Sequence, residues 1–149
     1  MASNKGYDTI LVAIDRTPEA DEVIASAIDV ADQHSAQLTV LTVVNPVTYA
    51  YASYDPVSVA ALPPEEEVRK SVLADLTEKV KAAGLSADQA DVRLGRPASV
   101  IKDTAKEIAA DLIVMGSHCR QGLGLLLGST ATGVLHGAPC DVLTLRIEE

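Results

Sequence analysis

The stretch LIVMGSHCRQGLGLLLGST, residues 112–130, decides how the whole chain is interpreted. It begins with an apolar run over 112–115, continues into a glycine-rich segment, and reaches Ser129-Thr130-Ala131-Thr132, which is typical of a helix start. The order of strand, glycine-rich loop and helix lets backbone N–H groups and a helix N-terminus face an anion. We therefore take residues 116–130 as the candidate functional loop and the remaining chain as the frame that holds it.

Strand and helix patterns alternate along the rest of the chain. Continuous β-rich runs predict strands at 9–14, 38–44, 90–94, 111–115 and 140–147. Apolar residues at helical spacing predict helices that start at Thr17-Pro18-Glu19, near 65 and near 129, and a further helix marked by apolar positions over 100–108, after a turn at 95–97. The pattern predicts an α/β fold, namely a single open five-stranded mostly parallel sheet with helices on both faces.

The strand order 3-2-1-4-5 gives this sheet a predicted ligand site. In that order the direction of winding reverses between the first and the fourth strand, and ligands of such sheets bind beyond the strand ends at the reversal. The order would place Asp15 and Gly116 side by side as the residues that end these two strands. Periodicity alone does not establish this strand order, and the predicted site depends on the order.

The bulk composition favours one domain over residues 1–149. The chain is 48% hydrophobic and 22% charged, as in ordinary globular proteins, and is long enough for a sizeable core. Its formal net charge of −9 disfavours nucleic acid and anionic membranes as partners, because both require clusters of Lys and Arg. We see no signal peptide, no apolar run long enough to cross a bilayer and no disulfide framework, and we therefore expect a cytoplasmic protein.

The irregular segment over 45–64 leaves two interpretations open. It contains four prolines and three of the four tyrosines, and a connection this long is unusual in a compact domain. It is either a lid or partner contact, or an excursion without a role of its own.

The glycine-rich loop matches neither of two common phosphate-binding motifs. No Gly-Lys-Ser/Thr follows the glycines, so the lysine of a Walker A loop is missing. The spacing of Gly122, Gly124 and Gly128 is one residue longer than the dinucleotide fingerprint, and it follows the fourth strand rather than the first. No residue set resembles a catalytic constellation or a metal site. The pattern favours a binding protein over an enzyme, and leaves slow ATP hydrolysis or autophosphorylation open.

Several short motifs together resemble the universal stress protein family. They are the opening strand ending in Asp15, Gly95-x-Pro97, Met115-Gly116-Ser117-His118, residues 126–129 and the closing segment 138–143, in the order and spacing of the family. The resemblance spans nearly the whole chain and implies a Rossmann-like domain that usually forms dimers. One branch of the family binds ATP through Gly-x-x-Gly, nine residues and Gly-Ser/Thr, whereas another branch lacks this motif and does not hold ATP.

This chain departs from the ATP-binding motif at two points. Cys119 occupies the position of the second glycine, and eight residues instead of nine separate it from Gly128. Gly116 and Gly128-Ser129 match the two ends of the motif, and Gly122 and Gly124 add flexibility between them.

The resemblance implies an adenine-nucleotide site, with ATP, alone or together with magnesium, as the ligand. Its residues would be Ala13, Asp15, Val43, Met115, Gly116, His118, Arg120, Gly128, Ser129 and Thr130. Asp15 would contact the ribose or adenine region, and Ala13 and Val43 would line the adenine pocket. Met115 and Gly116 would flank the nucleoside, and the other five residues would meet the phosphates. From the residues alone, Asp15 is either a turn residue or a ligand contact, and its place at the strand-order reversal favours the contact. Ser129 is a helix cap, a phosphate contact, or each in a different state.

The last predicted strand is a candidate interface between two copies of the chain. Val142, Thr144 and Arg146 alternate with Leu143, Leu145 and Ile147, and an apolar edge strand favours association unless it is covered. We expect a homodimer through this edge. The leading hypothesis is thus a cytoplasmic stress-response protein that binds ATP at the strand-1/strand-4 reversal and acts as a regulatory dimer. The alternatives are a nucleotide-free dimeric interaction module and a weak ATPase.

Overall fold

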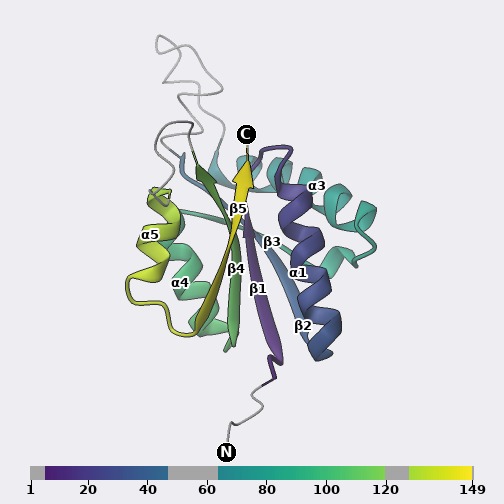
Figure 1. The fold of residues 1–149 in the computed structure, drawn as a ribbon. Coiled ribbons are helices and arrows are strands. Elements are labelled where there is room, and N and C mark those ends of the chain that lie inside the picture. Colours follow the sequence, from purple (N-terminus) through teal and green to yellow (C-terminus); the bar gives the residue numbers. More distant parts are fainter. Residues whose placement is uncertain (1–5, 47–63, 120–127, 149) are drawn as a thin grey trace, which may run out of the picture.

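The computed structural model describes residues 6–46, 64–119 and 128–148, and it has the predicted fold (Figure 1). Five parallel strands form one sheet in the order β3-β2-β1-β4-β5. The strands are β1 (Thr9–Ile14), β2 (Gln37–Val44), β3 (Ala90–Leu94), β4 (Leu112–Cys119) and β5 (Asp141–Glu148). The helices among the described residues are α1 (Ala20–His34), α3 (Glu65–Ala82), the 3-10 turn η2 (Ala87–Gln89), α4 (Pro97–Glu107) and α5 (Ser129–Leu135).

The helices cover both faces of the sheet (Figure 1). Helices α1 and α3 pack on one face, and α4 and α5 pack on the other. Successive residues of β1 point to opposite faces, so Ile10 and Val12 join the core under α1 and α3 while Leu11 and Ala13 join the core under α4 and α5. This explains why the strand is a continuous apolar run, since both of its faces are buried.

Helix α1 begins later than the sequence predicted. Its first residue is Ala20, and Glu19 occupies the N-cap position instead of Thr17. The hydroxyl of Thr17 donates to Asp15 Oδ1 at 2.5 Å, and the backbone N–H of Thr17 donates to the same oxygen at 3.2 Å. The prediction of a Thr17 cap is wrong because this turn already engages the threonine side chain.

Strand β4 extends beyond its predicted end at Met115. Its last pairing with β1 is Met115 opposite Ala13, but it continues to pair with β5 from Gly116 opposite Leu145 to Cys119 opposite Glu148. Gly116 is therefore a strand residue and does not end β4 beside the end of β1, as the sequence had suggested. The ladder with β5 supplies the backbone hydrogen bonds that keep this glycine-containing segment extended.

The N-terminal ends of three strands are tied together by two carboxylates. Asp111 Oδ2 accepts hydrogen bonds from the backbone N–H groups of Asp8 and Thr9, at 2.9 and 3.0 Å. The Tyr7 hydroxyl donates to Asp141 Oδ2 at 3.0 Å. This hydrogen bond is the largest cause of the raised pKa of the Tyr7 phenol, and burial is the second. The start of β1 is thereby held beside the starts of β4 and β5.

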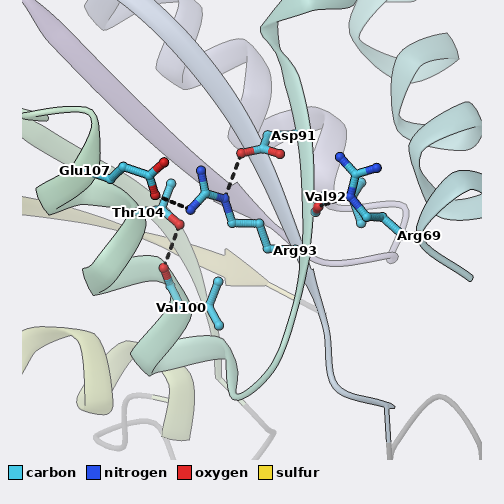
Figure 2. Close-up of polar contacts among 7 residues, drawn as sticks. All are labelled: Arg69, Asp91, Val92, Arg93, Val100, Thr104 and Glu107. Carbon is cyan, nitrogen blue, oxygen red and sulfur yellow. Dashed lines mark hydrogen bonds and ion pairs between the residues drawn. The ribbon is translucent and has the colours of Figure 1, made fainter. Parts of the chain in front are cut away.

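Two arginines flank the edge strand β3 (Figure 2). Arg93 donates to Asp91 Oδ2 at 2.9 Å and to Glu107 Oε2 at 2.5 Å, and so links β3 to the end of α4. On the other side of the strand, Arg69 from α3 donates through Nε to the carbonyl of Val92 at 3.1 Å. The contact with Glu107 contributes most to the raised pKa of Arg93, and the same contact lowers the pKa of Glu107.

Candidate functional site

A pocket of about 280 Å³ opens at the C-terminal ends of β1 and β4, where the strand order reverses. It has contributions from four neighbouring strands, β2, β1, β4 and β5, from α1 and α4, and from the beginning of α5. Most parallel α/β sheets that bind ligands do so at such a reversal. The pocket is therefore the first candidate for a functional site.

The pocket collects eight of the ten residues that the sequence predicted. These are Ala13, Asp15, Val43, Met115, Gly116, Gly128, Ser129 and Thr130. His118 lies in β4, but its side chain is outside the described part of the structure, and so is all of Arg120. The structure thus brings the eight together, and their role in binding stays a prediction. Most of the irregular segment over 45–64 and residues 120–127 of the candidate loop also lie outside the described residues.

The inner wall of the pocket is apolar and comes from adjacent strands. Ala13 of β1 lies directly opposite Met115 of β4, and both are buried in the core under α4 and α5. Val43 of β2 is half-buried beside them, and Ile101 of α4 closes the wall. Such an apolar wall with a few polar groups at its rim is typical of small-molecule pockets, and it suits a flat ring system such as a purine.

Asp15 provides a carboxylate at the rim of the pocket. It follows the last residue of β1, and its side chain is exposed. The two hydrogen bonds from Thr17 to Oδ1 hold the carboxylate in place. A fixed carboxylate at the end of a strand is the type of group that binds ribose hydroxyls in doubly wound nucleotide-binding proteins.

The other rim is the beginning of α5. Gly128 is the N-cap residue and Ser129 is the first helical residue, with no side-chain hydrogen bond capping the helix. The interpretation of Ser129 as a helix cap is therefore wrong, because it lies one position too late in the chain to be the N-cap. Both Ser129 and Thr130 line the pocket instead.

Gly116 of β4 is packed closely against the side chains of Val23 and Ile147. A Cβ atom built on this glycine would be 3.1 Å from Val23 Cγ2 and 3.1 Å from Ile147 Cγ1. Those distances are shorter than an ordinary van der Waals contact, so any larger residue must displace one of its neighbours. Both neighbours also line the pocket.

Sequence reasoning missed several lining residues, of which Ile147 is the clearest. Its position in β5 predicted only an edge strand, and nothing local to it indicates a pocket. Only the register of β4 and β5, in which His118 lies opposite Ile147, brings it to Gly116. Pro97 was recognised as part of a turn, and in the structure Gly95 has a φ of 143° and Pro97 starts α4 at the pocket.

The described residues contain neither a candidate metal site nor a candidate membrane span. No group of three or more His, Cys, Asp or Glu residues in that part of the chain is placed to hold a metal ion. In the same part of the chain, no helix combines the length and the apolar character that a membrane span needs.

The fold and the pocket define an open, doubly wound α/β protein with a pocket at the strand-order reversal. The sequence model of the universal stress protein family matches residues 6–146, and this chain belongs to that family. Universal stress protein A homolog 2 of Coxiella burnetii is 34% identical over 143 residues, which are 95% of this chain and 97% of the relative. A putative universal stress protein of Staphylococcus aureus is 32% identical over 145 residues, which are 96% of this chain and 86% of the relative.

Solved structures agree with this assignment. A universal stress protein from Lactobacillus plantarum superposes with a TM-score of 0.70 at 29% identity, over 96% of this chain and all of the other. A universal stress protein solved in complex with cAMP has the same fold, with a TM-score of 0.60 at 22% identity, over 95% of this chain and 98% of the other.

Proposed function

We propose that this protein binds an adenine nucleotide, ATP in the first place, in the pocket between β1 and β4, and acts in the stress response as a regulatory homodimer. The observation that carries the proposal is the convergence of eight predicted nucleotide contacts on one pocket at the strand-order reversal. A protein of the same fold that was solved with cAMP supports nucleotides as the ligand class. A cytoplasmic location belongs to the proposal as the sequence predicted it.

The chemistry of the lining supports one orientation of the nucleotide. The apolar wall of Ala13, Val43 and Met115 suits the adenine, and the Asp15 carboxylate suits the ribose hydroxyls. The remaining contacts, Gly128 to Thr130, are hydroxyl and backbone groups that suit phosphate oxygens. The pocket volume is close to the lower end of the range for small-molecule sites.

The binding proposal is tested by isothermal titration calorimetry with ATP, with and without magnesium. We expect sub-millimolar binding by the wild type and at least about tenfold weaker binding by Asp15→Ala, because the ribose loses a hydrogen bond to a charged group. Asp29→Ala is the matched control, since Asp29 is an exposed aspartate on α1 outside the pocket. The proposal fails if the wild type gives no heat and mass spectrometry finds no nucleotide on freshly purified protein.

The homodimer proposal rests on the difference between the two edges of the sheet. At one edge, α3 packs against β3 and Arg69 donates to the Val92 carbonyl. At the other edge, β4 is the only described element in extensive contact with β5. Leu143 and Leu145 of β5 are only half-buried. Pairing with a second copy would cover this strand. Light scattering at micromolar concentration that gives a monomer mass would refute the dimer.

Cys119 favours a second candidate function, a dimeric interaction module that holds no nucleotide. This residue replaces a glycine of the ATP-binding motif, and a side chain there hinders the close approach of phosphate to the backbone. In that case neither Asp15→Ala nor Cys119→Ala changes the protein's response to ATP. Calorimetry of Cys119→Gly separates the two candidate functions. Only the second candidate predicts that this variant binds ATP while the wild type does not.

A further inference from the structure

A second cavity, of about 520 Å³, lies at the end of the sheet opposite the candidate nucleotide pocket. It is formed by the last turns of α1, the first residues of β2 and the segment over 85–89, which includes η2. The nucleotide pocket lies at the C-terminal ends of the strands, and the two cavities share no lining residue. An occupant of the second cavity would therefore bind without touching the nucleotide.

Part of the lining of this cavity is apolar. Ala31 of α1 and Leu38 of β2 are buried residues of the core, and Ile28 and Leu85 are half-buried against the same core. Contact with these side chains would remove apolar surface from water, which is favourable. The cavity therefore suits the alkyl part of a long side chain.

The charged groups in the lining are all negative. Asp32, in the last turn of α1, and Asp88, in η2, carry exposed carboxylates, and the Ser86 hydroxyl donates a hydrogen bond to Asp88. The described residues that line the cavity include no Lys, Arg or His. The C-terminal end of α1 adds the negative pole of the helix dipole. We call this cavity the acidic groove, and its charge favours a cation.

The backbone beside the acidic groove indicates how an occupant enters. Strand β2 begins at Gln37, whereas its pairing with β3 begins only at Val40, opposite Ala90. In this interval the carbonyl of Leu38 already accepts a hydrogen bond from the side-chain amide of Gln89, at 2.9 Å. Because this acceptor is occupied, we expect an occupant to insert a side chain and not to add a strand.

We propose that the acidic groove is a docking site for a lysine or arginine side chain of a partner protein. The alkyl stem would lie against Ile28, Leu38 and Leu85, and the cationic end would meet Asp32 and Asp88. A basic partner surface also complements the net charge of −9. This inference goes beyond the proposed function and does not depend on nucleotide binding.

The exposure of the two carboxylates favours a protein over a free small cation as the occupant. Ion pairs with exposed carboxylates contribute little individually, because water and salt screen them. Useful affinity then requires further contacts around the acidic groove, and a protein surface supplies them through its polar rim.

The test is an NMR titration of the full nucleotide-free chain with a capped peptide of alternating glycine and arginine. We expect amide shifts confined to the acidic groove. The double variant Asp32→Asn, Asp88→Asn should bind the peptide about fivefold more weakly, the equivalent of two exposed ion pairs. The matched control is the double variant Glu22→Gln, Asp103→Asn, which removes two exposed carboxylates outside the groove and should bind like the wild type.

The other outcomes overturn the inference. Equal weakening in both double variants, or shifts spread over the whole surface, would mean that the peptide responds only to the overall charge. Equal binding of a glycine and glutamine peptide would show that the cationic groups are not recognised. Putrescine that binds as tightly as the arginine peptide would identify a site for a small cation in place of a partner protein. Absence of shifts at millimolar peptide would show that the groove binds no such side chain.

Discussion

Gly116 and Ile147 approach so closely that a Cβ atom on the glycine would be 3.1 Å from Ile147 Cγ1. One belongs to β4 and the other to β5, and both line the candidate nucleotide pocket. The pocket wall therefore includes the strand that we propose as the dimer edge. The packing at this point makes the site sensitive to small changes in volume.

The first prediction concerns this contact. Gly116→Ala should lower the free energy of unfolding by about 1–3 kcal/mol, because the new methyl group forces Val23 or Ile147 to move. It should also weaken nucleotide binding, since both displaced side chains line the pocket. Urea denaturation and calorimetry measure the two effects.

Gly128→Ser is the steric control for Gly116→Ala. A Cβ atom at Gly128 meets nothing within 4 Å, and serine is a favourable N-cap residue, so the fold should keep its stability. Equal stability of Gly116→Ala and wild type would show that the packing around β4 is looser than the structure indicates.

The second prediction concerns the hydrogen bond between Arg69 and the Val92 carbonyl. Arg69→Ala should cost about 1 kcal/mol of stability, the usual contribution of one hydrogen bond. It should also increase concentration-dependent association, because an edge strand with unpaired backbone groups recruits other strands. Chemical denaturation and light scattering check the two parts.

Glu66→Ala is the control for Arg69→Ala. It removes only the exposed ion pair of Arg69, at 3.6 Å, which contributes little to stability. Equal effects of the two variants would show that the ion pair, rather than the hydrogen bond to Val92, accounts for the loss.

The third prediction concerns the contact between Arg93 and Glu107 in acid. The arginine lowers the pKa of Glu107 in the folded protein, so the folded state holds this proton less tightly than the unfolded state. The stabilisation is complete above the ordinary pKa of glutamate, about 4.3, and is lost as the pH falls through the lower folded value. The melting temperatures of wild type and Glu107→Gln should therefore differ at neutral pH and converge in acid. Glu78→Gln, which removes an exposed carboxylate on α3, is the matched control.

The fourth prediction concerns Tyr7 in alkali. The hydrogen bond to Asp141 raises the pKa of the phenol, so the stabilisation is complete below the ordinary tyrosine value of about 10 and is lost as the pH rises through the folded value. The absorbance titration of the wild type minus that of Tyr7→Phe isolates this residue among the four tyrosines. In Asp141→Asn the same difference titration should shift to lower pH. An unshifted titration would mean that Tyr7 and Asp141 do not interact in solution.

The candidate site was predictable from the sequence where its residues follow local motifs. Asp15 comes directly after a buried strand, and Gly128 and Ser129 stand at a helix start, so each could be assigned from its neighbours in the chain. Ile147 could not be assigned in this way, because it enters the pocket through the pairing of β5 with β4, and no residue near it in the chain predicts that pairing.

The sequence by itself determined the alternation of strands and helices and the class of the fold. Both follow from short-range patterns, such as the apolar run over 9–14 and Glu65 after Pro64 at the start of α3, because hydrophobic periodicity acts over a few residues. The tertiary structure alone decided the start of α1 at Ala20 and the extension of β4 to Cys119. Those boundaries depend on the Asp15–Thr17 turn and on the ladder with β5, since pairing and side-chain contacts override local propensity.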